Sequence, residues 1–232
     1  MLRLDDLSFA YGSVKAVNQV SIDVVEGSIH GLIGPNGAGK STCIDLISGR
    51  QRPTSGAVRF RDRDITSMSA PRRRHLGIAR SFQRISVYPA LTVADQLDIA
   101  SRLVGEEDVD AVVTALGLAS CLALRPAAIG YGEQRRVDIA LALLGAPALV
   151  LLDEPAAGLS REESIALADH LAALVRDRGM TVVLVEHHLE VVYRVCDRLT
   201  VLEQGAVIAD GVPQEVRRDP RVVAAYLGRG AA

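Results

Sequence analysis

The chain has 232 residues, a length that suits one large domain with a sizeable buried core. Its net charge of -2, its 3% aromatic content and its lack of Trp argue against nucleic acid as a partner. Cys43, Cys121 and Cys196 show no C-x-x-C spacing, so we expect buried thiols in a reducing compartment. We expect no secretory signal at the N-terminus, and the longest apolar stretch, Ile139 to Leu152, is too short to span a bilayer.

The first part of the chain predicts strands around a single helix. Residues 2–33 alternate in apolar character between turn signals and read as a β-rich start that ends in the apolar run Ile29–Ile33. Residues 41–48 read as a helix directly after that run, and strand character returns at 57–60. The segment that joins the apolar run to the helix therefore connects a strand to a helix N-terminus.

The middle of the chain predicts helices. Thr92 can cap a helix that runs through Arg102, and two more helices are expected over 106–116 and 131–144. We therefore expect a helical subdomain inserted into an α/β core. The basic triplet at 72–74 is interpreted as a solvated face without a function.

The last part of the chain predicts a buried parallel sheet. Leu149–Leu152 and Thr181–Val185 are continuous apolar runs, which suit strands buried on both faces, and an amphipathic helix lies between them. The last fifty residues are interpreted as short strands alternating with turns.

Residues 34–42 form a complete G-x-x-x-x-G-K-[ST] phosphate-binding loop. Backbone N–H groups can converge on a chain of anionic oxygens only where no side chain intervenes, and glycine allows this. Lys40 adds a point charge at the β- and γ-phosphates, and the Ser41 hydroxyl is placed to ligate Mg²⁺. A glycine-rich turn that binds nothing would require neither group. The predicted ligands of a nucleoside triphosphate are Gly34, Pro35, Asn36, Gly37, Ala38, Gly39, Lys40, Ser41 and Thr42.

Two consecutive carboxylates, Asp153 and Glu154, follow the apolar run at 149–152. A strand of a parallel sheet presents such groups at its carboxyl edge, where open α/β folds bind ligands. Asp153 is predicted to serve the Mg²⁺ shell, and Glu154 to polarise the attacking water. The alternative, two acids that merely begin a helix, carries less weight beside a phosphate loop.

The chain resembles the ATP-binding subunit of ABC transporters over nearly its whole length. Beyond the phosphate-site motifs, Gly130 to Arg136 (Gly-Tyr-Gly-Glu-Gln-Arg-Arg) is similar to the signature loop that separates this family from other phosphate-loop enzymes. The resemblance implies an α/β fold with a phosphate-loop NTPase core, an antiparallel β subdomain and an inserted helical subdomain. It implies a single ATP-binding domain over 1–232, with the core and β subdomain at about 1–82 and 146–232 and the helical subdomain at about 83–145.

The resemblance also assigns roles to single residues. Tyr11 matches the aromatic that stacks on adenine, and Gln83 matches the glutamine that links Mg²⁺ and the attacking water to the membrane subunit. His187 matches the histidine that hydrogen-bonds the γ-phosphate, residues 157–159 match the loop that crosses the dimer interface, and Gly132 belongs to the loop that contacts the partner's ATP. Tyr11 alone would suit a turn, and Gln83 alone a solvated strand. The implied catalytic residues are Lys40, Gln83, Glu154 and His187, with Ser41, Gln83 and Asp153 at Mg²⁺.

Three details qualify this picture. The histidines of Glu186-His187-His188 would point to opposite faces if the strand continued, so a metal site there is not expected. Gly130 stands where the family usually carries serine, which removes a hydroxyl from the contact with the γ-phosphate across the dimer. Leu141 replaces an arginine common in the helix that follows.

Several stretches, including Gly77 to Gln83 and Glu154 to Leu159, resemble the branched-chain amino-acid importer subclass. The function that this implies is ATP hydrolysis, with ATP and Mg²⁺, that energises import of branched-chain amino acids or a similar small solute. The alternatives are a lipopolysaccharide-export-type ATPase, a non-transport ABC ATPase, or a binding module with impaired hydrolysis. The implied partners are a second ATP-binding subunit, identical or not, paired head to tail, and separate transmembrane permease subunits. The chain itself is expected to lie at the cytoplasmic face of the cell membrane as a peripheral subunit.

Overall fold

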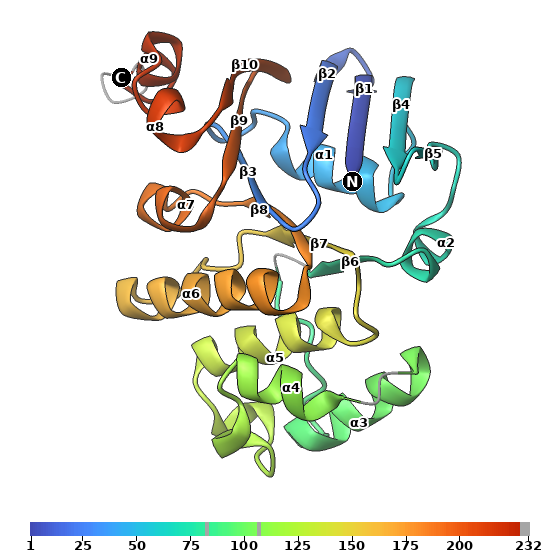
Figure 1. Ribbon diagram of the computed structural model, residues 1–232, viewed down its shortest axis with the longest axis vertical. Helices are drawn as coiled ribbons and strands as arrows, with labels where there is room; N and C mark the ends of the chain where they lie inside the picture. The colour runs from blue at the N-terminus through green and yellow to red at the C-terminus, as the bar shows by residue number, and fades with distance from the viewer. Residues whose placement is uncertain (82–83, 106–107, 228–232) are drawn as a thin grey trace.

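The computed structural model describes residues 1–81, 84–105 and 108–227 (Figure 1). Its centre is a six-stranded sheet in the order β10-β9-β3-β8-β7-β6, in which only the edge pair of β10 and β9 is antiparallel. The parallel pairing predicted for the two later apolar runs is confirmed. The strands are β3 (Ile29–Ile33), β6 (Ile78–Ser81), β7 (Leu149–Asp153), β8 (Thr181–Val185), β9 (Arg198–Glu203) and β10 (Ala206–Gly211).

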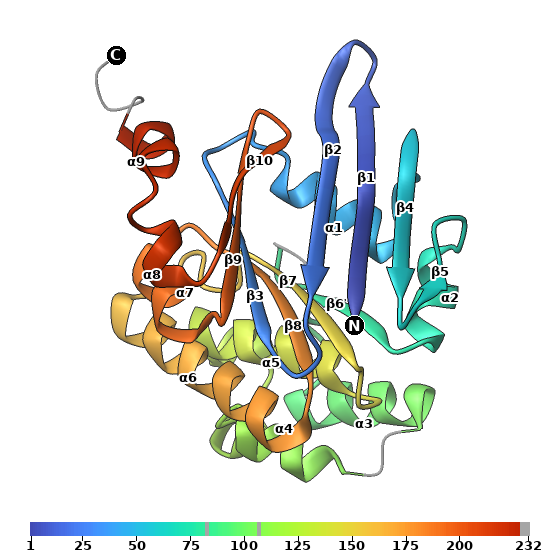
Figure 2. The same cartoon turned by 45° about the horizontal axis from the view of Figure 1, so that its top comes forward.

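The N-terminal region forms a second, antiparallel sheet of four strands in the order β2-β1-β4-β5. It is the predicted antiparallel β subdomain, and the long β1–β2 hairpin stands beside the six-stranded sheet (Figure 2). The strands are β1 (Leu2–Tyr11), β2 (Val14–Val24), β4 (Ser55–Phe60) and β5 (Arg63–Asp64). The predicted α/β fold with an antiparallel β subdomain is confirmed.

Helix α1 (Lys40–Ser48) lies between the two sheets (Figure 2). Its Ile44 and Ile47 share a core with Leu151 and Val183 of the parallel strands and with the antiparallel sheet. The alternate residues of the same parallel strands, such as Val150, face a second core built with helices on the opposite side. Burial on both faces explains why these strands are apolar without interruption.

Three helices inserted between β6 and β7 form the helical region (Figure 1). The predicted cap at Thr92 is confirmed, since its hydroxyl accepts from the backbone N–H of Asp95 in a reciprocal capping box. The second helix begins at Val109, later than predicted, because the Asp108 side chain caps it by accepting from the backbone N–H of Ala111. The helices are α3 (Val93–Val104), α4 (Val109–Ala115) and α5 (Tyr131–Leu143), joined by 3-10 turns at Ala119–Cys121 and Pro126–Ala128.

Helix α6 (Arg161–Arg178) is the predicted amphipathic helix between β7 and β8. The interpretation of the last fifty residues as strands and turns was wrong in part, since α7 (Leu189–Val195), α8 (Pro213–Val216) and α9 (Pro220–Leu227) lie there beside β9 and β10. These helices are short, and each buries only a few side chains, mostly valines. Their sequences therefore show little of the apolar periodicity that predicts a helix. Within the described ranges no helix has the length and apolar character needed to cross a lipid bilayer.

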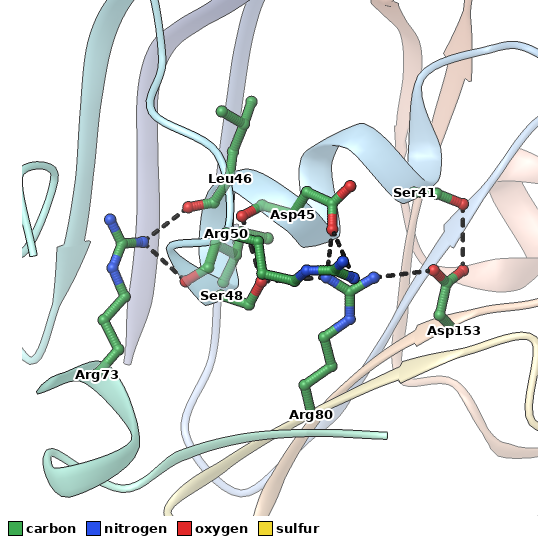
Figure 3. A network of polar contacts seen from close by, with 9 residues as sticks. Ser41, Asp45, Leu46, Ser48, Arg50, Arg73, Arg80 and Asp153 are labelled. Carbon is green, nitrogen blue, oxygen red and sulfur yellow. Dashed lines mark hydrogen bonds and ion pairs between the residues drawn. The ribbon is translucent and has the colours of Figure 1, made fainter. Parts of the chain in front are cut away.

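The interpretation of residues 72–74 as a solvated face was wrong for Arg73. This residue lies in helix α2 (Ala70–His75), is 1% exposed, and donates to the backbone carbonyl of Leu46 at 2.7 Å (Figure 3). It also donates to the backbone carbonyl of Ile47 at 2.8 Å. The last carbonyls of a helix lack partners within it, and Arg73 satisfies two of them at the end of α1. The three cysteines are buried and unpaired, as predicted.

Candidate nucleotide-binding site

The phosphate loop, residues 34–42, runs from the end of β3 into the first turn of α1. Gly34, Gly37 and Gly39 adopt φ of 146°, 77° and 101°. A Cβ on Gly34 would lie 2.1 Å from the carbonyl oxygen of Leu202, and one on Gly39 would lie 2.2 Å from that of Ala16. Gly37 has open space around it. Glycine is therefore required at two positions for close backbone packing, and the loop keeps an open side.

Lys40 bends back over the loop. Its Nζ donates to the backbone carbonyls of Gly34 at 2.8 Å and Pro35 at 2.9 Å. Burial lowers the pKa of Lys40, while the negative charges of Glu154 and Asp153 oppose that shift. Two neutral carbonyl oxygens therefore hold the Lys40 ammonium beside the loop. An anionic ligand bound in the loop would attract the ammonium more strongly than these carbonyls do.

A cavity of about 720 Å³ opens in front of the loop. Such a volume lies within the range of small-molecule sites. The structure brings Glu154 and His187 to the same cavity although more than a hundred residues separate them from the loop in sequence. The lining residues are Ala16, Asn36, Gly37, Ala38, Gly39, Lys40, Ser41, Thr42, Glu154 and His187.

Asp153 ends β7 beside the first turn of α1. Its side chain is almost fully buried, and its Oδ1 accepts from the Ser41 hydroxyl at 3.3 Å (Figure 3). Burial raises the pKa of Asp153, and the Arg80 guanidinium opposes this shift. A carboxylate and a hydroxyl that converge in this way are the hard oxygen donors that Mg²⁺ prefers, so the donor set fits that ion.

Arg80 is a residue of the site that sequence reasoning missed. It projects from β6 between Asp45 of α1 and Asp153, with nitrogen–oxygen distances of 2.5 and 3.3 Å (Figure 3). Its side chain is 10% exposed. The signal was an arginine inside a short strand that begins with the buried residues Ile78 and Ala79, because a buried cation of this kind requires anionic partners.

Glu154 and His187 meet at the carboxyl edge of the sheet. Glu154 Oε1 lies 2.7 Å from His187 Nε2. An ionised carboxylate only accepts hydrogen bonds, so the His187 tautomer with its proton on Nε2 donates the hydrogen bond to Glu154. The Glu154 backbone adopts φ of 52°, uncommon for a residue with a side chain, and its N–H donates to the Val185 carbonyl at 2.9 Å. The carboxylate is thereby turned toward the segment after β8 that contains His187.

The remaining predicted residues lie elsewhere. Tyr11 ends β1 with 51% of its surface exposed, in edge-to-face contact with Phe9 at a centroid distance of 4.8 Å, and does not line the cavity. Gly132 lies in the first turn of α5, a helix on the other side of the six-stranded sheet from α1 (Figures 1 and 2). It lines a separate cavity of about 130 Å³. Gln83 lies outside the described residues.

Comparison with known proteins identifies the family. Residues 17–157 match the family described as ABC transporter, and residues 206–232 match one described as branched-chain amino acid ATP-binding cassette transporter. The chain is 33% identical to the high-affinity branched-chain amino acid transport ATP-binding protein LivG of Salmonella typhimurium and 31% identical to BraF of Pseudomonas aeruginosa, and each comparison covers 98% of both chains.

Solved structures agree. A nucleotide-free ATP-binding cassette from an ABC transporter superposes with a TM-score of 0.89 at 29% identity over 99% of both chains. The ADP conformation of the cassette MJ1267 gives the same TM-score at 30% identity over 99% of both chains. With the phosphate loop, the acidic strand end and the fold in agreement, the chain belongs to the ABC transporter family as an ATP-binding cassette.

Proposed function

We propose that the chain is the ATP-hydrolysing subunit of a transporter that imports branched-chain amino acids or a similar small solute. The observation that carries the proposal is the joint cavity of the phosphate loop, Glu154 and His187, which holds a phosphate cradle and a candidate base in one space. The solute class is supported by LivG and BraF, whose names describe branched-chain amino acid transport and which align over almost their full lengths.

The loop residues 34–42 would bind the triphosphate, with Lys40 at the β- and γ-phosphates. Ser41 and Asp153, together with Gln83, would hold Mg²⁺, which neutralises part of the charge on the transferred phosphoryl group when bound. Tyr11 would stack on adenine with its exposed ring.

Glu154 would orient and polarise the attacking water, because it lines the cavity beside the loop and its carboxylate accepts hydrogen bonds. His187 holds that carboxylate at 2.7 Å and would donate to the γ-phosphate. Lys40 and backbone N–H groups of the loop would stabilise the charge that spreads over the phosphoryl oxygens.

A second cassette would complete each site. Within one chain the signature loop at Gly132 and the phosphate loop lie on opposite sides of the sheet, so Gly132 does not line the chain's own cavity. Head-to-tail pairing would bring Gly132 and the N-terminus of α5 to the ATP of the partner subunit, where the positive end of the helix favours anionic oxygens. The pair would act with separate permease subunits, at the cytoplasmic face of the membrane.

Reconstitution tests this function. The chain is placed in proteoliposomes with candidate permease subunits and a solute-binding protein from the same organism. Uptake of radiolabelled leucine, isoleucine and valine is then measured with ATP inside. Uptake that requires ATP and is lost with Lys40→Ala is expected. ATP hydrolysis without amino-acid uptake, coupled instead to release of a lipid from the membrane, would support a lipopolysaccharide-export-type system and contradict the proposed direction.

A further inference from the structure

Glu186 is a buried carboxylate at the candidate site that the roles above do not use. It directly follows β8 and is 2% exposed. Its Oε1 accepts from the backbone N–H of Ala156 at 2.7 Å, and its Oε2 accepts from the backbone N–H of His187 at 2.9 Å. One side chain therefore joins two segments that are thirty residues apart and both adjoin the cavity.

The two bonds require a carboxylate. Burying an ionised group is costly unless it is hydrogen-bonded, and here each oxygen has a close backbone donor. The backbone N–H of His188 is a further, longer donor to Oε2 at 3.4 Å. A glutamine of the same shape has only one acceptor oxygen, so its NH₂ group would face one of the two N–H groups. That N–H would be left buried without an acceptor, which disfavours the present position of its segment.

Ala156 lies two residues after Glu154, in the segment between β7 and α6. This segment contacts α5, the helix that follows the signature loop. The carbonyl of Ala156 accepts from the backbone N–H of Leu159 at 3.1 Å, which closes a turn. Within that turn Gly158 lies against Tyr131 of α5, since a Cβ on Gly158 would sit 2.9 Å from its ring. A shift of Ala156 would therefore move Gly158 against Tyr131, the first residue of the helix that carries the signature loop.

We propose that Glu186 is a positioning residue that couples His187 to the segment 156–159 and, through Gly158, to the N-terminus of α5. The inference rests on the proposed function, in which His187 binds the γ-phosphate and the other two elements face the partner cassette. A shift of His187 on binding the γ-phosphate would then move the segment 156–159 and the N-terminus of α5 through the Glu186 carboxylate. These two elements form the surface that contacts the second subunit in the proposed pair. Glu186 itself does not touch the nucleotide.

The test compares wild type with Glu186→Gln and with the matched control Glu190→Gln. Glu190 lies four residues further on, in an exposed ion pair with Arg161, and such pairs contribute little. Three quantities are measured: nucleotide affinity of the isolated cassette, kcat, and ATP-dependent dimerisation in a Glu154→Gln background. Loss of one charge-assisted bond corresponds to roughly tenfold, so we expect Glu186→Gln to lower kcat and weaken dimerisation by at least about that factor.

The nucleotide affinity separates positioning from general damage. The phosphate loop is untouched in Glu186→Gln, so the dissociation constant of a fluorescent nucleotide should change by less than about twofold. The proposal is overturned if kcat and dimerisation stay within twofold of wild type, if nucleotide affinity falls in parallel with them, or if Glu190→Gln has an equal effect.

Residue-resolved hydrogen exchange gives a readout that does not depend on activity. In the wild-type chain the Ala156 and His187 amides should be protected together, and in Glu186→Gln at least one should exchange roughly tenfold faster. Unchanged exchange at both amides would contradict the coupling. A wild-type chain without ATPase activity would contradict the proposed function, and the exchange data would still decide whether Glu186 joins the two segments.

Discussion

At the residue scale, the candidate site contains charged side chains whose positions depend on neighbouring residues outside the sequence motifs. The motifs predicted Lys40, Asp153 and Glu154 because each stands at a fixed place beside a loop or a strand end. Arg80 and Glu186 escaped prediction because the partner of a buried charge is chosen by tertiary contacts, which one sequence does not reveal. Two proposed roles at this scale can be tested by substitution: stacking of Tyr11 on adenine, and the contact of Gly130 in the signature loop with the partner's ATP.

Tyr11 is expected to bind adenine through the face of its ring. Its exposure leaves the ring accessible, and stacking on a base contributes roughly 1 to 3 kcal/mol. Tyr11→Ala should therefore weaken ATP binding, while Tyr11→Phe should preserve it. Titration with a fluorescent nucleotide measures both variants, and equal affinity of the alanine variant and wild type would return Tyr11 to a turn residue.

Gly130 is expected to accept a serine. It caps α5 with φ of -66°, and a Cβ there would lie 3.6 Å from Glu133 Oε2, an ordinary contact. Gly130→Ser would restore a hydroxyl toward the partner's γ-phosphate, and a hydrogen bond to a charged group contributes about 1.5 to 3 kcal/mol. The ATP-bound dimer should therefore tighten about tenfold or more, as measured by analytical ultracentrifugation.

Gly130→Ala is the matched control, because it adds the Cβ without the hydroxyl. In a homodimer the serine variant should alter both sites, whereas in a heterodimer it should alter only the site that uses the partner's phosphate loop. Identical dimerisation of the serine and alanine variants, alone and with a candidate partner cassette, would show that the backbone contacts suffice.

At the element scale, elements with a continuous or periodic apolar pattern were predictable, and short helices without a side-chain cap were not. Helices α1, α3, α5 and strands β7 and β8 lie within two residues of their predicted bounds, since each combines a regular apolar pattern with a cap or a glycine. Helices α2 and α7 span two turns or fewer, and neither has a side-chain cap. Their positions are set by packing, which also places Arg73 at the end of α1.

Arg73 is expected to stabilise the end of α1. Besides Leu46 and Ile47, it donates to the carbonyls of Met68 and Thr66, all at 3.0 Å or less. Arg73→Met would keep an apolar side chain of similar length and remove the guanidinium donor from all four carbonyls, of which, among the described residues, Leu46 alone keeps a backbone donor, the N–H of Gly49. We expect a cost of about 3 kcal/mol in the free energy of unfolding. Urea denaturation measures this value.

The control for Arg73 is its exposed neighbour Arg72, whose change to Met should cost less than about 0.5 kcal/mol. Similar losses in both variants would show that the basic triplet acts through its overall charge and not through the bonds of Arg73.

His30 is expected to make the pairing of β3, β9 and β10 sensitive to acid. Its Nε2 lies 2.8 Å from the Thr200 hydroxyl, which itself donates to Asp210, so Nε2 must carry a proton and Nδ1 none. Burial lowers the pKa of His30 to about 4, with Asp210 opposing and Arg198 reinforcing the shift.

Because the unfolded chain takes up a proton near pH 6.5 and the folded chain only near 4, stability is lost as the pH falls through this window. A shift of this size corresponds to about 3 kcal/mol in the free energy of unfolding at the acid end. Urea denaturation at several pH values should show a flatter profile for His30→Gln than for wild type. Parallel profiles between pH 6.5 and 4 would exclude His30 as the cause.

At the scale of the whole molecule, the phosphate loop and the proposed signature loop of one chain lie apart. Helix α1, which follows the phosphate loop, lies on one face of the six-stranded sheet, and α5, which begins at the signature loop, lies on the other (Figure 1). Gly132 of that loop does not line the cavity in front of the phosphate loop. This separation is the reason that we expect ATP to join two cassettes and its hydrolysis to part them. The signature motif predicted this arrangement by resemblance, since no intrachain contact could have revealed it.

The most direct test of this account is Glu154→Gln, with the exposed Glu162→Gln as control. Removing the charge of the proposed base should leave nucleotide affinity unchanged and lower steady-state ATP turnover by at least about 100-fold. Size-exclusion chromatography with ATP should then show a stable dimer for Glu154→Gln, and a monomer without nucleotide. Near wild-type turnover in Glu154→Gln, or no dimer with ATP, would contradict hydrolysis by Glu154 in an ATP-bound pair of cassettes.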